Sequence, residues 1–196
     1  MSIFLDYLAE NRELFGRLDA LDGAVSAAVS AIALSLRAGG KVMFCGNGGS
    51  AADSQHLAAE LTGRFVDDRK PLAGLALTTD TSALTCIAND YDFSTIFSRQ
   101  VLALGRAGDC IVGISTSGNS PNVIAGFEAA RRLSITTIGL LGRDGGKLRE
   151  MADVAIVVDS LVTARIQEAH ILIGHTLCGA VERELGCGGS ASSAAT

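Results

Sequence analysis

The chain has 196 residues, which fits one domain of ordinary size, and 48% of them are hydrophobic. Charged residues make up 19% and the formal net charge is −5, whereas a nucleic-acid surface needs clustered basic side chains, so we expect no nucleic-acid partner. The first residues are acidic, which argues against a secretory signal, and the apolar runs are too interrupted to predict a membrane span. Five cysteines without a CxxC pair indicate reduced thiols and a cytoplasmic protein.

Residues 2–38 form the first predicted helical segment. Its part 23–35, GAVSAAVSAIALS, is rich in alanine and apolar on several sides. A helix of this kind must be covered on more than one side. In so small a domain it predicts an oligomer, or a helix that lies across a neighbouring element. Gly39 and Gly40 follow it, as glycine often follows a helix end.

From residue 41 onwards, short apolar runs alternate with helical segments. The runs are continuously apolar, which is typical of strands covered on both faces in a parallel sheet. They span residues 41–45, 72–77, 110–115, 136–141 and 154–158. The helices between and after them are predicted at 50–62, 81–88, 94–104, 122–132 and 163–185.

Strand and helix in turn predict right-handed βαβ units. The predicted fold class is therefore α/β, a three-layer doubly wound sandwich with a five-stranded parallel sheet. We predict a single domain over residues 1–186 and a disordered tail over 187–196, because GCGGSASSAAT is small and polar.

The loop after the first predicted strand is rich in glycine. It reads GNGGS, residues 46–50, and in such folds ligands bind beyond the carboxyl ends of the strands. Glycines let the backbone approach a ligand, and the N–H groups that begin the next helix attract an anion. The spacing matches neither a dinucleotide-binding GxGxxG nor a P-loop. A plain tight turn would have the same composition.

The loop after the third predicted strand is rich in hydroxyl groups. Residues 115–122 read STSGNSPN and lie where a helix begins. Hydroxyls and backbone N–H groups at the positive end of a helix form a phosphate cradle without Lys or Arg. One helix cap needs a single hydroxyl, so phosphate binding is favoured over an over-capped turn. The four hydroxyl residues are Ser115, Thr116, Ser117 and Ser120.

The chain has only three histidines, His56, His170 and His175. His56 and Glu60 are four residues apart, which puts both on one face of a helix. Such a pair can bind a divalent metal or act as an acid and a base. The spacing is common, however, and on its own it favours a surface pair that stabilises the helix slightly.

The last predicted helix carries Gln167, Glu168 and His175. Glu168 and His175 are seven residues apart and nearly eclipsed, whereas Gln167 lies roughly 80° around the helix from His175. A helical wheel therefore prefers Glu168 as the partner of His175.

Five long segments together resemble the phosphoheptose isomerases, a family with the SIS fold. The segments are GNGGSAADSQHLAAELTGRF, ALTTDTSALTCIANDY, FSRQV, STSGNSPN and ARIQEAHILIGHTLCGAVE. The resemblance runs from about residue 3 to residue 186. It implies conversion of sedoheptulose 7-phosphate to D-glycero-D-manno-heptose 7-phosphate through an enediol, the first step of ADP/GDP-heptose and lipopolysaccharide precursor biosynthesis. It also implies a homotetramer with active sites between subunits.

The resemblance further implies the roles of individual residues. Glu60 is expected as the base between C1 and C2, and His175 as the partnering acid/base. One Zn²⁺ per subunit is expected on His56, Glu60, Gln167 and His175, which selects Gln167 against the helical wheel. Asp53 and Gln55 are candidates for a supporting role. The substrate-binding residues are expected to be Asn47, Gly48, Gly49, Glu60, Asn89, Asp90, Ser115, Thr116, Ser117, Ser120 and Gln167, of which the four hydroxyl residues hold the phosphate.

Two rival interpretations belong to other functional classes. A related non-catalytic SIS tetramer binds the bacterial replication initiator, but it lacks the carboxylate and the histidine that correspond to Glu60 and His175. A sugar-phosphate-binding SIS module that senses its ligand would not need Glu60 opposite His175. Both residues are present in this chain, which favours the enzyme.

Overall fold

The computed structural model describes residues 2–66 and 68–187, so the tail predicted to be disordered lies, apart from Cys187, outside the described residues. Its centre is a five-stranded sheet in which all neighbouring strands are parallel, in the order β2-β1-β3-β4-β5. The strands are β1 (Val42–Gly46), β2 (Gly74–Ala76), β3 (Cys110–Ser115), β4 (Thr136–Gly142) and β5 (Val154–Val158). The predicted fold class and the parallel sheet are confirmed.

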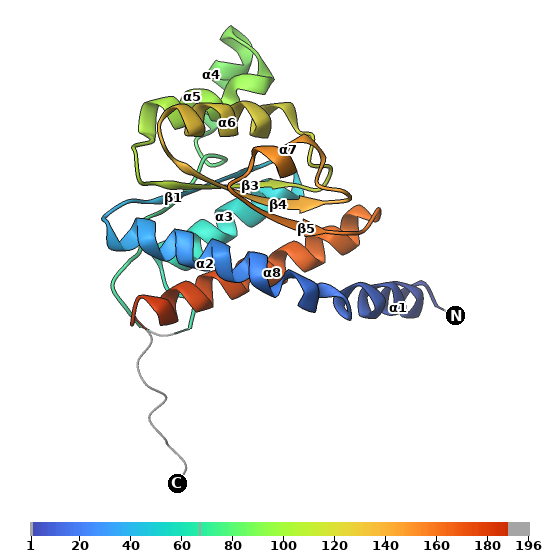
Figure 1. Cartoon of the computed structure of the whole chain (residues 1–196). Coiled ribbons are helices and arrows are strands. Elements are labelled where there is room, and N and C mark those ends of the chain that lie inside the picture. Colours follow the sequence, from blue (N-terminus) through green and yellow to red (C-terminus); the bar gives the residue numbers. More distant parts are fainter. Residues whose placement is uncertain (1, 67, 188–196) are drawn as a thin grey trace.

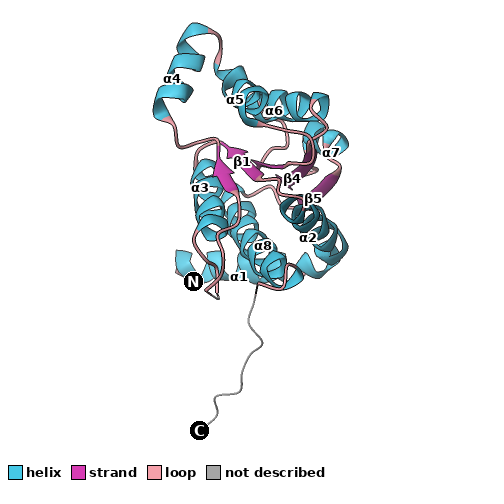
Figure 2. Cartoon of the chain, turned by 90° about the vertical axis from the view of Figure 1, so that its left-hand side faces the viewer, coloured by secondary structure: helices cyan, strands magenta, loops and turns pink. Residues whose placement is uncertain are grey.

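Helices cover both faces of the sheet (Figure 1). One layer holds α1 (Ile3–Phe15), α2 (Asp22–Arg37), α3 (Gly49–Thr62) and α8 (Thr163–Glu184). The opposite layer holds α5 (Ile96–Leu104), α6 (Pro121–Arg132) and α7 (Gly146–Met151), and α4 (Thr81–Asp90) projects beyond it (Figure 2).

The sheet separates two hydrophobic cores because successive side chains of a strand point to opposite faces. In β1, Val42 and Phe44 join the core formed with α2, α3 and α8. Met43 and Cys45 join the core formed with α5 and α6. This two-sided burial explains why the strands are continuously apolar in the sequence.

Two predicted elements differ from the observed ones, and one observed helix was not predicted. The helical segment 2–38 is interrupted, because α1 ends at Phe15 and a short 3-10 turn, Leu18–Leu21, precedes α2. The strand β2 is shorter than predicted. The helix α7 was not predicted, since it has only six residues and begins after Gly145, whose φ is +88°.

The N-terminal helices bury only part of their apolar surface. In the described residues, Leu18–Arg37 is the one helical stretch that is long and apolar enough to cross a membrane, by length and composition only. Ala28, Val29 and Ile32 of this stretch are buried against the core, and a core helix passes the same test. In α1, by contrast, Ile3 and Phe4 are exposed.

Candidate active site at the carboxyl edge of the sheet

The strand order reverses between β1 and β3, which are neighbours although β2 lies between them in sequence. The helices that follow these two strands, α3 and α6, lie on opposite faces of the sheet (Figure 1). The glycine-rich loop and the hydroxyl-rich loop therefore both lie at the switch point, where ligands bind in open α/β sheets.

A pair of side-chain amides joins the two loops. Asn47 Nδ2 donates to Asn122 Oδ1 at 2.9 Å, and Asn122 Nδ2 donates to Asn47 Oδ1 at 2.8 Å. Asn122 is buried at the start of α6. Sequence reasoning placed Asn47 at the substrate but missed Asn122 as its partner; its place in the STSGNSPN motif was the available signal.

The hydroxyl-rich loop gathers its serine side chains around one point. Ser115 Oγ lies 2.8 Å from Ser120 Oγ and 3.5 Å from Ser117 Oγ. Ser120 is the N-cap residue of α6, yet its side chain makes no capping hydrogen bond to the helix. Gly118 has φ +65° and packs against Gly145 and Gly146, a contact that a side chain would block. The hydroxyls are thus held near the positive end of α6 by the backbone around them.

Thr116 belongs to the same loop and is half-buried between Ser115 and Ser117. Gly48 and Gly49 begin α3 on the neighbouring loop, where Gly48 has φ +56°. A backbone of this kind carries no side chain that would cover the N–H groups at the start of α3.

Two histidines and a carboxylate converge between α3 and α8. His56 Nε2 lies 2.8 Å from His175 Nε2, and the same atom of His56 lies 3.5 Å from Glu60 Oε1. The imidazole of His175 is also 5.4 Å from the ring of Phe65, measured between centroids. The structure therefore brings His175, which lies 119 residues after His56, next to the i,i+4 pair of His56 and Glu60.

Gln167 and Glu168 lie on different sides of α8. The amide of Gln167 packs against Gly49, so closely that a Cβ at Gly49 would collide with it. Glu168 instead accepts hydrogen bonds from Arg165 Nη2 and from Asn11 Nδ2, each at 2.7 Å. Glu168 therefore belongs to the packing of α1 on α8, and Gln167 faces the glycine-rich loop.

The donor types at this position suit a divalent metal such as zinc. Two imidazole nitrogens face each other, and a carboxylate oxygen lies next to one of them. Over residues 2–66 and 68–187, no group of three or more His, Cys, Asp and Glu side chains is arranged to hold one ion. The ligand set of His56, Glu60, Gln167 and His175 fits in kind, and it stays a prediction.

Asp53 lies one turn before His56 and belongs to the same electrostatic cluster. Burial raises the pKa of the Asp53 carboxyl, while the nearby imidazoles of His56 and His175 act in the opposite direction. Its Oδ2 atom is buried without a hydrogen-bond partner among the described residues. Asp53 is therefore placed to support the two histidines.

Asn89 and Asp90 of the same chain lie away from the cluster of His56, Glu60 and His175. They lie at the exposed end of α4, where Asn89 Nδ2 donates to Asp90 Oδ1 at 2.8 Å. This hydrogen bond, followed by one from Cys86, lowers the pKa of Asp90. In the described part of the chain, no hydrogen bond or ion pair joins either residue to the two loops or to His175. Their predicted contact with substrate remains a prediction.

Comparison with known proteins shows the family to which the chain belongs. Residues 6–142 match the model of the SIS domain family. A phosphoheptose isomerase of Rhodospirillum rubrum is 57% identical over 173 residues, which cover 88% of this chain and 92% of that protein. The structure of a phosphoheptose isomerase from Neisseria gonorrhoeae is similar with a TM-score of 0.87 and 48% identity, covering 92% and 97% of the two chains.

A phosphoheptose isomerase from Francisella tularensis has a similar structure at 38% identity, with a TM-score of 0.89 over 92% of this chain and 96% of that one. Identity of this extent over nearly the whole length goes well beyond a shared fold. The chain belongs to the phosphoheptose isomerase family of SIS-domain proteins.

Proposed function

We propose that this protein is a phosphoheptose isomerase that converts sedoheptulose 7-phosphate to D-glycero-D-manno-heptose 7-phosphate. The observation that carries the proposal is the contact between His56 and His175 beside Glu60, in a chain whose relatives are named phosphoheptose isomerases. A SIS tetramer that only binds a replication initiator has no use for this cluster and is not favoured.

The reaction needs a base that removes a proton next to a carbonyl and a second group that moves protons on oxygen. Glu60 serves as the base that carries the proton between C1 and C2. His175 serves as the acid/base on the oxygens. These two steps interconvert ketose and aldose through an enediol.

The 7-phosphate binds at the hydroxyl-rich loop. Ser115, Thr116, Ser117 and Ser120 donate hydrogen bonds to it, together with the backbone N–H groups at the start of α6. The amide pair of Asn47 and Asn122 fixes this loop relative to the glycine-rich loop, which lines the sugar. The chain of the sugar thus reaches from the phosphate loop towards Glu60.

His56, Glu60, Gln167 and His175 would hold one Zn²⁺. When bound, the metal would polarise the carbonyl and stabilise negative charge on its oxygen. Other divalent metals accept the same donor types.

A cytoplasmic homotetramer with sites between subunits is part of the proposal. Exposed apolar residues on α1, on α2, on α8 and in the loop before α8 support it: Ile3, Phe4, Leu34, Leu172 and Leu161. Asn89 and Asp90 at the end of the projecting helix α4 would then contact substrate across a subunit boundary. The same step would supply the precursor pathway of lipopolysaccharide.

Direct turnover of sedoheptulose 7-phosphate, followed by NMR, tests the proposal. Wild type supplied with zinc should form the aldose, and Glu60→Gln and His175→Ala should lose activity while staying folded. Glu128→Gln, on the exposed face of α6, is the matched control and should keep full activity. Binding of the sugar phosphate without conversion by wild type would refute the enzyme and indicate a sensing module.

A further inference from the structure

A buried arginine caps the C-terminal end of α3, the helix that carries Glu60. Arg69 lies in the loop between α3 and β2, and its side chain is only 2% exposed. Arg69 Nη2 donates to the carbonyl oxygen of Glu60 at 2.8 Å, and Nη1 donates to that of Leu61 at 2.9 Å. These carbonyls belong to the last turn of α3, where helix carbonyls lack partners within the helix and a positive charge is favourable.

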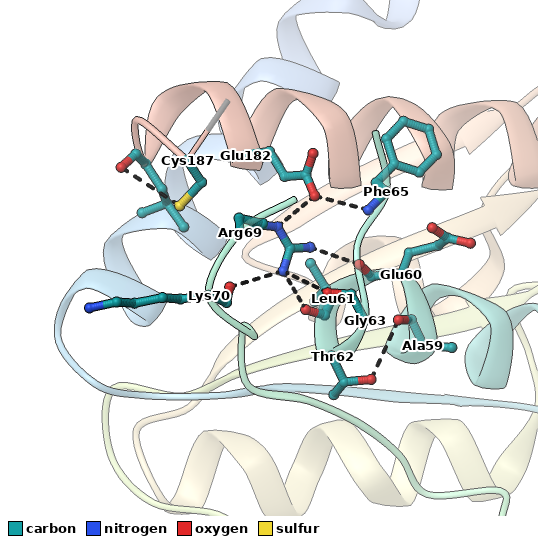
Figure 3. Close-up of polar contacts among 11 residues, drawn as sticks. Ala59, Glu60, Leu61, Thr62, Gly63, Phe65, Arg69, Lys70, Glu182 and Cys187 are labelled. Atoms are coloured by element: carbon teal, nitrogen blue, oxygen red, sulfur yellow. Dashed lines mark hydrogen bonds and ion pairs between the residues drawn. The ribbon is translucent and has the colours of Figure 1, made fainter. Parts of the chain in front are cut away.

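The same arginine is paired with a buried carboxylate on the helix that carries His175. Arg69 Nε donates to Glu182 Oε1 at 2.6 Å, and the carboxylate side chain is 3% exposed. Glu182 lies seven residues after His175, two turns along the same face of α8. Figure 3 shows the guanidinium between Glu182 and the end of α3, with the Glu60 carboxylate pointing away from it.

A third contact links this pair to the ring beside His175. The backbone N–H of Phe65 donates to Glu182 Oε1 at 3.0 Å, and the ring of Phe65 lies against the imidazole of His175. One ion pair therefore fixes the backbone of Glu60, the loop position of Phe65 and the relative placement of α3 and α8.

We propose that Arg69 and Glu182 are positioning residues that hold Glu60 and His175 in the arrangement the isomerisation needs. This inference rests on the proposed function of those two residues. Among the described residues, no hydrogen bond or ion pair joins Arg69 or Glu182 to the substrate loops or to the imidazoles, so the pair acts through the backbone of α3 and through Phe65. A shift of about 1 Å in a reacting group can lower a rate by about a hundredfold.

An alternative explanation is that the ion pair only stabilises the fold. The two explanations differ because a buried ion pair can often be replaced by apolar residues without loss of stability, whereas removal of one partner is strongly destabilising. Apolar residues would fill the space, but they cannot donate to the carbonyls of Glu60 and Leu61. Stability and activity should therefore separate in a double variant.

Four variants carry the test. Arg69→Lys keeps the charge but cannot reach Glu182 and both carbonyls at once, and Glu182→Gln keeps an acceptor for Phe65 without the charge. Arg69→Met combined with Glu182→Leu should recover stability relative to Arg69→Met alone. In Arg69→Lys and in the double variant, we expect kcat to fall about ten- to a hundredfold and KM to stay within about twofold, because the phosphate loop is untouched.

Asp109→Asn is the matched structural control. Lys41 Nζ lies 2.6 Å from Asp109 Oδ2, and the Asp109 side chain is also 3% exposed, but the two residues precede β1 and β3 at the opposite edge of the sheet. This variant should lose stability and keep kcat at a temperature where it is folded. The proposal is overturned if the folded double variant has wild-type kcat. It is also overturned if kcat falls with the loss of stability to the same extent in variants of the Arg69–Glu182 pair and in Asp109→Asn.

The imidazole resonances give a readout that does not depend on turnover. With only three histidines in the chain, each Hε1 signal can be assigned by single substitution. In Arg69→Lys the signal of His175 should move, because Phe65 shifts relative to its ring, while that of the buried His170 stays in place. If the His175 signal moves in Arg69→Lys but the wild-type protein does not turn over sedoheptulose 7-phosphate, the positioning role stands and the proposed reaction is rejected. If the His175 signal does not move, the positioning role is rejected.

Discussion

Acid should destabilise this protein through one buried histidine. His170 lies in the middle of α8 with 0% exposure, and its Nε2 is 3.1 Å from the carbonyl oxygen of Leu141. Burial lowers the pKa of His170 to about 4, and the hydrogen bond to this carbonyl acts in the opposite direction. The neutral ring donates from Nε2, and Nδ1 is buried without a hydrogen-bond partner among the described residues.

The sign follows from proton binding in the two states. Between the unfolded pKa of 6.5 and the folded value of about 4, the unfolded chain binds the proton and the folded chain does not. The free energy of unfolding therefore falls as the pH is lowered through this window. The two pKa values give a loss of about 2 kcal/mol at pH 5 and about 3 kcal/mol at pH 4 from this residue alone.

The assay is urea unfolding of wild type and His170→Leu at pH 7.5 and pH 5.0, at one protein concentration. The variant should be less stable at pH 7.5 by about 1–3 kcal/mol, because the Leu141 carbonyl loses its donor. Between the two pH values, however, it should lose about 2 kcal/mol less than wild type. Ile173→Ala, buried on the same helix, is the control that is destabilised at both pH values with the wild-type pH dependence. An equal loss in wild type and His170→Leu would refute the reasoning.

Three further predictions concern the loops and the metal. Asn122→Ala removes both hydrogen bonds to Asn47, so KM for sedoheptulose 7-phosphate should rise about tenfold with little change in kcat; an unchanged KM would contradict the coupling of the loops. Ser120→Ala removes a donor from the proposed phosphate cradle, so inhibition by inorganic phosphate should weaken by about three- to tenfold; unchanged inhibition would place the phosphate elsewhere. Gly49→Ala introduces a Cβ into the space of the Gln167 amide, so zinc content per chain should fall in a protein that stays folded; full zinc content would exclude Gln167 as a ligand.

The sheet and its two layers could be predicted from sequence because burial on both faces leaves a direct signature. Residues such as Val42, Met43 and Phe44 are all buried, although they face different cores, and a strand between two layers needs adjacent apolar side chains of this kind. The strand order could not be predicted in the same way, because it depends on which loops cross over the sheet. That order places the glycine-rich loop beside the hydroxyl-rich loop.

The polar contacts between distant segments were the least predictable part of the site. Arg69 and Glu182 are 113 residues apart, and each is unremarkable in its own segment of sequence. The buried ion pair depends on the space between α3 and α8 and on carbonyls at the end of α3 that lack partners within the helix, neither of which is a property of local sequence. The pairing of Asn47 with Asn122 has the same origin.

Gln167 and Glu168 show how the surroundings decide a question that helical spacing leaves open. The wheel makes Glu168 the closer neighbour of His175, because seven residues are almost two whole turns. In the structure α1 packs along this side of α8, and Arg165 and Asn11 hold the Glu168 carboxylate there. These two charge-assisted contacts stabilise the Glu168 carboxylate in this position. The neutral amide of Gln167 faces Gly49. Because Gly49 has no side chain, the glycine-rich loop leaves room for this amide, and Gln167 rather than Glu168 lies at the carboxyl edge of the sheet.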